Sequence, residues 1–352
     1  MTQRFYIHVG PHKTGTTYVQ GLLAGNHDVL GTQGVLFPRR NWHAQARAVR
    51  DVVRRGSMPT TGRSVAGEWD TLLAEVREWS GPSAVISHEM LSTATAAEIR
   101  GLVRSLRGWD VHVVFTARDL TRVAPAMWQT RLRSAQPVTW TEYARALQHP
   151  EAVAGSGGQR FWLGQDAAAV LGRWGKHLPV AHLHVLTVPP SGSPPALLWQ
   201  RFCAVLGVEP TGHDLDPKRS NPSLGTAEAE LLRRVNAALS TSGIEPQDWL
   251  RWARWLGRHL EGRAGAARFT LPPEDFSWLA ERSERMVSDL RSGGYPITGD
   301  LDDLIPRPLP AGEGRHPEDT TDGAVLDVAV DAIRGLVVRL AAQRSESTGD
   351  EG

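Results

Sequence analysis

A short run near the N-terminus combines two glycines, a lysine and three threonines between an apolar stretch and a segment with helical spacing. It reads Gly10-Pro11-His12-Lys13-Thr14-Gly15-Thr16-Thr17. A glycine-rich turn between a strand and a helix directs backbone N–H groups and the positive end of the helix dipole at one point, which favours an anion. The pattern therefore predicts a cradle for a phosphate or sulfate group.

The position of the lysine separates this loop from the nucleotide-binding P-loop. Gly10 and Gly15 are spaced as in that motif, but Thr16 stands where the P-loop needs lysine. The lysine lies inside the loop instead, at Lys13, so the usual contact of lysine with the β- and γ-phosphates is lost. The spacing argues against an ATPase or kinase, and a P-loop kinase-like phosphotransferase is kept as an alternative.

The run Lys13-Thr14-Gly15-Thr16-Thr17 resembles the first loop of the sulfotransferases that use 3′-phosphoadenosine-5′-phosphosulfate (PAPS). The resemblance covers motifs within about residues 4–135 and extends to bacterial sulfotransferase-like proteins. It implies that PAPS is the sulfuryl donor and that Lys13, Thr16 and Thr17 hold the 5′-phosphosulfate. Lys13 would also stabilise charge on the leaving oxygen. The rest of the binding loop is Gly10, His12, Thr14 and Gly15, with His12 either touching the anion or shaping the loop.

Arg118 follows the third predicted strand. In the family, an arginine at this place and a serine eight residues later bind the 3′-phosphate of PAPS, so the resemblance implies this role for Arg118. Ala126 stands at the serine position, which removes one hydrogen-bond donor, and Arg122 or Arg131 are candidates to replace it. The alternative for Arg118 is an ion pair with Asp119. Ala126 also supports a second alternative, a catalytically inactive protein that binds PAPS or another nucleotide.

The segment Ser87-His88-Glu89 offers the base that sulfuryl transfer needs, because a proton must leave the acceptor hydroxyl or amine. In the family the base is a histidine in small-molecule enzymes and often a glutamate in carbohydrate-modifying ones. Neighbours on a strand point to opposite faces, so we expect only one to reach the site, and we favour Glu89 over His88. The alternative is that Glu89 caps the next helix while His88 packs in the core. His43 and Trp128 are weaker candidates, for the acceptor pocket and the adenine.

Four β-rich runs position these residues, at 4–9, 84–87, 111–116 and 182–187, and helical patterns follow them, for example from Thr95 to Arg107. Strands alternating with helices predict an α/β fold with a parallel sheet flanked by helices. The loop, Glu89 and Arg118 then lie at the carboxyl ends of strands, where ligands bind in such sheets. The resemblance implies a P-loop-like sulfotransferase fold with a helical C-terminal extension.

The predicted domain spans residues 1–300, with a PAPS-binding core at 4–190 and a helical extension at 195–293. Residues 301–352 follow as a Pro/Gly-rich linker, at about 306–322, and a C-terminal helix, at about 325–340. The single cysteine, Cys203, is read as a core thiol.

The composition limits the classes of partner that the chain is expected to bind. The 39 basic and 38 acidic side chains nearly cancel, so no general attraction to nucleic acid or to an anionic membrane is expected. No segment approaches about 18 uninterrupted apolar residues, which predicts no membrane span, and the lack of a signal-like run favours a cytoplasmic location. We expect a small-molecule or carbohydrate acceptor and no metal, while the sequence leaves open whether the chain is a homodimer.

Overall fold

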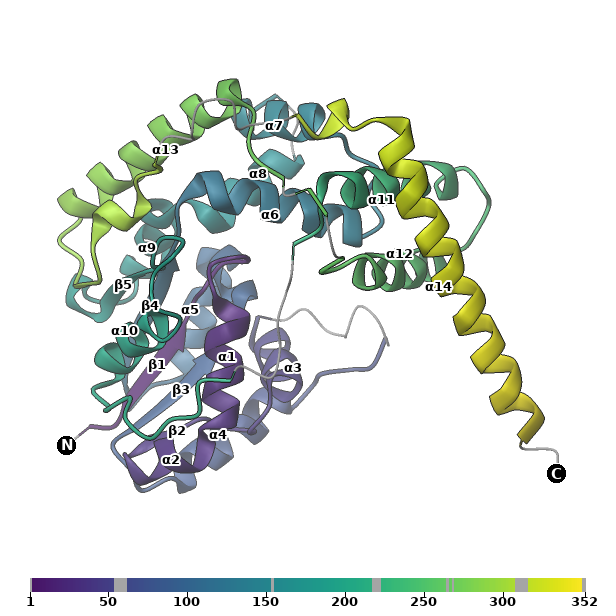
Figure 1. The fold of residues 1–352 in the computed structure, drawn as a ribbon. Coiled ribbons are helices and arrows are strands. Elements are labelled where there is room, and N and C mark those ends of the chain that lie inside the picture. The colour runs from purple at the N-terminus through teal and green to yellow at the C-terminus, as the bar shows by residue number, and fades with distance from the viewer. Residues whose placement is uncertain are drawn as a thin grey trace. The chain divides into compact units, whose positions relative to one another are not determined.

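A six-stranded parallel β-sheet lies at the centre of one of the two compact units of the chain (Figure 1). The computed structural model describes residues 2–53, 62–152, 155–216, 223–263, 266–267, 269–307 and 316–349. The strand order is β2-β3-β1-β4-β5-β6, and every pair is parallel. The strands are β1 (Arg4–His8), β2 (Val35–Leu36), β3 (Ser83–Ser87), β4 (Asp110–Ala117), β5 (Leu183–Thr187) and β6 (Ile297–Thr298). The predicted α/β class is confirmed, and the four expected strands are β1, β3, β4 and β5.

Helices α1 (Thr16–Gly25) and α10 (Leu197–Leu206) cover one face of the sheet. Apolar side chains of α1, such as Leu22, form one buried cluster with Trp199 and Phe202 of α10 and with Tyr6 of β1. Cys203 belongs to the same cluster and is fully buried, which confirms the core thiol. Burial of this apolar surface holds the two helices on the sheet.

Helices also cover the opposite face. Helix α9 (Ala167–Gly175) contacts β4 and β5, and α3 (Trp42–Val52) contacts β3, α4 (Glu68–Glu78) and α5 (Ala96–Ser105). Trp69 of α4 meets Phe5 of β1 edge to face, with ring centroids 6.4 Å apart. Helix α5 begins with a capping box formed by Thr95 and Glu98, which explains why the helix starts where the sequence predicts it. The same unit contains α2 (His27–Thr32), α8 (Gly157–Gln165) and the short turns η1 (Glu89–Thr93), η2 (Val180–His182) and η3 (Leu301–Leu304).

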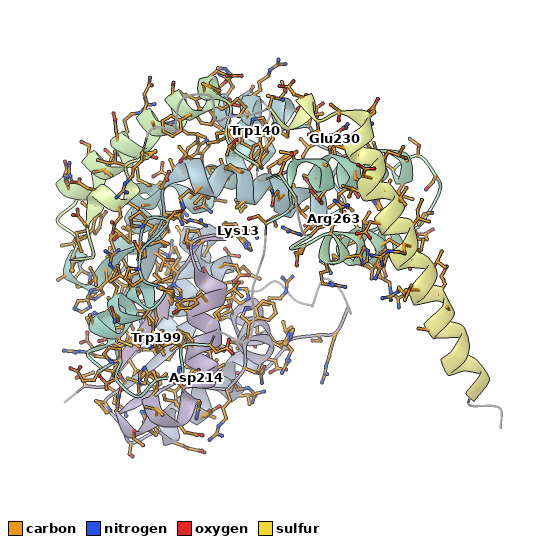
Figure 2. The ribbon with its side chains drawn as sticks, viewed as in Figure 1. Lys13, Trp140, Trp199, Asp214, Glu230 and Arg263 are labelled. Atoms are coloured by element: carbon orange, nitrogen blue, oxygen red, sulfur yellow. The ribbon has the colours of Figure 1, made fainter. Side chains whose placement is uncertain are left out.

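The second compact unit is helical and consists of residues 124–148, 221–277 and 308–352. It contains α7 (Trp140–Gln148), α11 (Thr226–Leu239), α12 (Pro246–His259), η4 (Pro317–Asp319) and α14 (Asp322–Gly349), with parts of α6 (Leu120–Arg133) and α13 (Pro273–Ser292). Within it, Trp140 packs against Trp128 and Phe269 and donates a hydrogen bond to Asp275 (Figure 2). Trp128 is 1% exposed, so the interpretation of Trp128 as an adenine contact is wrong: its ring fills the core of this unit.

The two units do not follow the domain limits expected from the sequence. The first unit comprises residues 1–123, 149–220 and 278–307, so the helical segment 195–293 is divided between the units. Helix α10 and most of α13 belong to the first unit, whereas α11 and α12 belong to the second. The C-terminal helix is present as α14, while residues 308–315 of the expected linker lie outside the described residues. None of the helices described is both long enough and apolar enough to cross a membrane.

Candidate functional site

The loop between β1 and α1 is built from left-handed backbone turns. Lys13 has φ 69° and Gly15 has φ 84°, and Gly15 immediately precedes the first residue of α1. A left-handed conformation costs a residue with a side chain about 1–2 kcal/mol, so the surrounding structure must hold Lys13 in place. Such turns direct successive backbone N–H groups at one point, and the helix dipole of α1 adds positive potential there. The loop therefore has the backbone geometry of an anion cradle.

Close packing explains both glycines. A Cβ atom at Gly10 would lie 2.6 Å from Nε2 of His8, 2.6 Å from Oγ1 of Thr16 and 2.7 Å from Oγ1 of Thr116. A Cβ atom at Gly15 would lie 2.5 Å from Cδ2 of Leu198, and its positive φ disfavours any side chain. The two glycines singled out by their spacing are thus the residues that let the loop close onto the sheet.

A buried histidine at the end of β1, His8, connects the sheet to the loop through hydrogen bonds. His8 ends β1, and its Nδ1 lies 2.7 Å from the Ser87 hydroxyl of β3, while its Nε2 lies 3.4 Å from the Thr116 hydroxyl of β4. The Thr116 hydroxyl is in turn 2.8 Å from that of Thr14. Burial lowers the pKa of His8 to about 3 against the opposing effect of Glu89, so this imidazole is neutral at pH 7. The network joins three strands to the loop.

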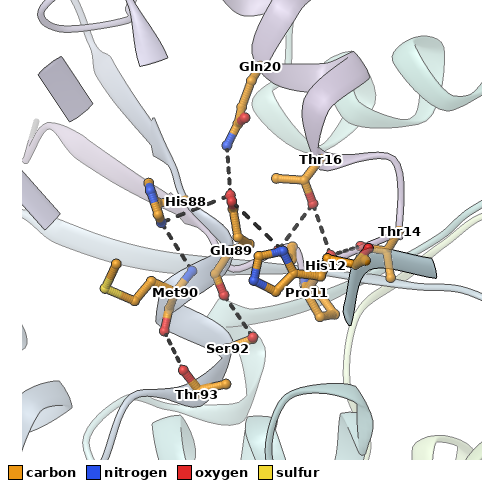
Figure 3. Close-up of polar contacts among 12 residues, drawn as sticks. Pro11, His12, Thr14, Thr16, Gln20, His88, Glu89, Met90, Ser92 and Thr93 are labelled. Atoms are coloured by element: carbon orange, nitrogen blue, oxygen red, sulfur yellow. Dashed lines mark hydrogen bonds and ion pairs between the residues drawn. The ribbon is translucent and has the colours of Figure 1, made fainter. Parts of the chain in front are cut away.

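The threonine hydroxyls serve the loop in two ways. Thr14 is fully buried and donates a hydrogen bond to the Pro11 carbonyl, 2.7 Å away. The hydroxyl of Thr16 lies 3.1 Å from the carbonyls of both Gly10 and Pro11 (Figure 3). These two side chains therefore fix the conformation of the loop. The predicted contact of Thr16 and Thr17 with a phosphosulfate stays a prediction.

Two side chains from distant parts of the sequence bind the loop through its carbonyl oxygens. Arg118, directly after β4, donates from Nη1 to the Lys13 carbonyl at 2.6 Å. Gln165, the last residue of α8, donates from Nε2 to the His12 carbonyl at 2.7 Å. The structure thus brings Arg118 to the loop, as predicted, and adds Gln165. The Asp119 carboxylate accepts hydrogen bonds from the backbone N–H and hydroxyl of Thr121 and so caps α6.

The neighbours that could replace the missing serine are engaged elsewhere. Ala126 lies in α6, where its carbonyl accepts a hydrogen bond from the Thr130 hydroxyl. Arg122 donates to the Pro189 carbonyl, and Arg131 donates to the side chain of Gln136. A role for either arginine at a 3′-phosphate stays a prediction.

The Glu89 carboxylate lies between His88 and the loop residue His12 (Figure 3). It is 3.9 Å from Nδ1 of His12, 4.0 Å from Nδ1 of His88 and 3.5 Å from Nε2 of Gln20. Because β3 ends at Ser87 and the 3-10 turn η1 begins at Glu89, strand alternation does not apply to these neighbours, and the expectation that only one of them reaches the site stays a prediction.

The two candidate bases differ in their surroundings. His88 is 4% exposed, stacks on Trp42 and accepts a hydrogen bond at Nδ1 from the Met90 N–H, so His88, and not Glu89, caps the turn. Burial alone would raise the pKa of Glu89. The charges of His88 and His12, and hydrogen bonds from its own backbone and Gln20, lower the pKa by more than burial raises it, so the net shift is downward. Glu89 is therefore a carboxylate at neutral pH, the form in which it can accept a proton.

Sequence reasoning missed His8, Gln20, Thr116 and Gln165, and a role for His43 in an acceptor pocket stays a prediction. His43 is exposed on α3 and contacts the edge of Trp42. The available signal for His8 was a polar residue at the end of an otherwise apolar strand beside Gly10. No comparable signal marked Gln165, because nothing in the sequence shows that α8 ends at the loop.

Fold and site together define an α/β protein with a glycine-rich loop at the carboxyl edge of a parallel sheet and a carboxylate beside that loop. No family model matches the chain, and no curated protein sequence matches it. Among solved structures, the chain is similar to the sulfotransferase domain from the curacin biosynthetic pathway, with a TM-score of 0.39 and 12% sequence identity. That similarity covers 84% of this chain and 99% of the other.

Proposed function

We propose that this chain is a sulfotransferase that uses PAPS as its sulfuryl donor and modifies a hydroxyl or amine of a small molecule or carbohydrate. The observation that carries the proposal is the carboxylate of Glu89, 3.9 Å from His12 within the lysine-containing loop. A proton acceptor thus stands next to an anion cradle. A P-loop enzyme that transfers phosphoryl groups has a lysine directly after the second glycine, whereas this loop has Thr16 at that position.

The residues present fit the donor. Gly10 lets the loop pack closely against His8, Thr16 and Thr116, and Lys13 supplies a positive charge within the same loop. Arg118 contacts the loop through the Lys13 carbonyl, which places a guanidinium group near the same edge of the sheet. Arginine suits a phosphate because its planar fork can form paired hydrogen bonds. These features support a 5′-phosphosulfate on the loop and a 3′-phosphate at Arg118.

In the proposed reaction Glu89 takes a proton from the acceptor hydroxyl or amine as the acceptor atom forms a bond to sulfur. The bond between sulfur and the 5′-phosphate oxygen breaks, and Lys13 stabilises the negative charge that develops on that oxygen. When bound, PAPS supplies the electrophilic sulfuryl group. The products are the sulfated acceptor, 3′-phosphoadenosine-5′-phosphate and a protonated Glu89, which returns its proton to water.

Calorimetry with nucleotides tests the proposal before any acceptor is known. We expect 3′-phosphoadenosine-5′-phosphate to bind without added metal, more tightly than adenosine 5′-phosphate, because Arg118 contacts only the 3′-phosphate. Arg118→Ala should remove most of that difference, whereas Arg104→Ala, exposed on α5, should leave it unchanged. Preference for Mg-ATP would support the kinase-like alternative. Tight binding together with failure to sulfate any member of a broad acceptor panel would support the inactive binding protein.

A further inference from the structure

Four side chains meet at the end of β4 and β5 that lies opposite the loop. They are Asp110, His112, His182 and His184. Asp110 begins β4, His112 lies two residues further on, and His184 is in register with Val114, whereas Arg118 follows the last residue of β4, so the cluster lies toward the opposite end of these strands from Arg118. None of these four residues has a role in the proposed transfer.

The donor atoms of the cluster have the spacing of metal ligands. Nε2 of His112 lies 3.2 Å from Oδ2 of Asp110, and Nδ1 of His182 lies 3.5 Å from Oδ1 of the same carboxylate. One ligand atom from each of the three side chains lies within 4.8 Å of the others. Ligands bound tetrahedrally at about 2.0–2.1 Å lie roughly 3.3 Å apart. To bind an ion, Nδ1 of His182 must leave the Val111 carbonyl, 3.1 Å away, and the imidazoles of His112 and His182, now stacked with centroids 4.3 Å apart, must turn toward one point.

His184 supplies the outer partner that a metal-bound histidine needs. Its Nε2 lies 2.9 Å from Nδ1 of His112. With a metal on Nε2 of His112, the proton of that ring moves to Nδ1 and is donated to His184, the arrangement that commonly orients a ligating imidazole.

We infer that the histidine cluster binds one transition-metal ion of the zinc class through Asp110, His112 and His182, with His184 positioning His112. The nearest opposing charge is Arg4, whose Nε lies 3.8 Å from Oδ2 of Asp110 and whose side chain is largely exposed. Arg4 can turn towards solvent when a cation binds. The ion would join the start of β4 to η2, and thus fix the entry to β5.

Titration of the full chain with Co²⁺, followed by the visible absorption of tetrahedral cobalt and by competition with Zn²⁺, tests this inference. We expect one equivalent to bind, and His112→Ala and His182→Ala to abolish binding. His184→Ala should weaken it about 10–100-fold, the usual effect of losing an outer partner. His149→Ala is the matched control, because His149 is exposed, lies 3.7 Å from Glu151 and does not belong to the cluster.

Circular dichroism would show that each variant is folded, and Asp110→Asn, which keeps the size of the side chain, gives a second loss-of-ligand variant. No saturable Co²⁺ or Zn²⁺ binding by the folded wild type would overturn the inference. Binding that persists in both His112→Ala and His182→Ala would overturn it as well.

An independent feature lies on α14 of the second unit. Five large apolar side chains of this helix, Leu326, Val330, Ile333, Val337 and Leu340, are each between 46% and 63% exposed. Their spacing alternates between four and three residues, the heptad pattern of a coiled-coil seam. Another side of the helix buries Val325 and Val328 within its own unit, so the helix is anchored there while the seam faces solvent.

The charges beside the seam favour a second copy of this chain as its partner, although Arg334 also pairs with Asp331 on its own helix, 2.6 Å away. Asp327 and Arg334 each follow a seam residue, and both are exposed on the same side of the helix. Asp327 and Arg334 occupy the same position of the heptad, directly after a seam residue. In an antiparallel pair of identical helices, residues at this position face each other, so Asp327 of one copy meets Arg334 of the other, twice by symmetry. A parallel pair would instead bring Arg334 to Ala329. We propose that two copies associate through antiparallel α14 helices.

Sedimentation equilibrium of the full chain at micromolar concentration tests the association. We expect a dimer, a monomer for the double variant Val330→Glu/Val337→Glu, and a dimer for the control Ala342→Glu, an exposed position of α14 outside the seam. Asp327→Arg and Arg334→Asp should each weaken the dimer, and their combination should restore it. A monomeric wild type, or a dimer unchanged by the two glutamates, would refute the proposal, and failure of the combined variant to restore would refute the antiparallel arrangement.

Discussion

The substitution Gly10→Ala probes how tightly the loop closes onto the sheet. The added methyl group would meet three buried polar atoms, on His8, Thr16 and Thr116, at 2.6–2.7 Å. Separations of that size are well inside van der Waals contact, so at least one of these side chains must move. Because His8 and Thr116 are fully buried and joined to each other, movement breaks hydrogen bonds that water cannot replace.

The cost has two parts. Forcing a methyl group into a packed interior typically costs about 1–3 kcal/mol. Leaving a buried donor or acceptor without its partner adds about 1–3 kcal/mol. We therefore expect Gly10→Ala to lower the free energy of unfolding by about 2–6 kcal/mol and to weaken binding of 3′-phosphoadenosine-5′-phosphate, because the loop backbone shifts with the network.

Gly25→Ala is the matched control, since Gly25 is exposed in the last turn of α1 and an added Cβ meets nothing within 4 Å. It should raise the free energy of unfolding by about 0.5–1 kcal/mol, because alanine favours a helix over glycine. Urea unfolding followed by circular dichroism measures both effects, and calorimetry below the transition measures the affinity. If Gly10→Ala matched the wild type within 0.5 kcal/mol and bound the nucleotide normally, the close packing around Gly10 would be refuted.

Three further outcomes follow. Lys13→Ala should lower kcat about 10²–10³-fold, while the affinity for the product nucleotide changes by less than tenfold. Lys176→Ala is the control, because Lys176 is exposed just after α9. Equal losses in kcat and in affinity would contradict a role of Lys13 in the transition state. If Glu89 is the base, kcat/KM should stay flat down to about pH 5, since the pKa of Glu89 is lowered from an ordinary value of about 4.3. Glu89→Gln should then lower the rate about 10²–10⁴-fold. An acidic limb of the profile that His88→Asn removes would instead assign the histidine as the base. Burial raises the pKa of Cys203 to about 12, so a thiol reagent at pH 8 should label the protein only in urea, and rapid labelling of the native chain would contradict its burial.

The sequence predicted the parts of the fold that arise from local patterns. Strands β1, β3, β4 and β5 are apolar runs followed by helices, so both their positions and their parallel arrangement could be read from periodicity. The two-residue strands β2 and β6 carry no such pattern and form only because a neighbouring strand offers an edge. The division into two units was equally invisible, because it depends on which segments return to the sheet.

The candidate site shows the same limit. Gly10 and Lys13 were found from their types and spacing and Arg118 from the family resemblance, and the structure brings the loop and Arg118 together. His8 and Gln165 were missed because their roles arise from contacts between residues far apart in the sequence, such as the 153 positions between His12 and Gln165. The directions of the Glu89 and His88 side chains could not be predicted from strand alternation, because the strand ends at Ser87 and the period of two gives way to a turn.

The late position of β6 has a consequence for how the chain is made. This edge strand pairs with β5 but follows it by about 110 residues, and the adjacent turn η3 is fixed when Asp303 binds Arg201. At a synthesis rate of about 5–20 residues per second, the residues between β5 and β6 take roughly 5–20 s to be made, and during that time one edge of β5 is unpaired. An unpaired edge is a template for aggregation. Slow translation between the two strands should therefore lower the soluble yield, and a nascent chain shorter than 298 residues should depend on chaperones that shield β5.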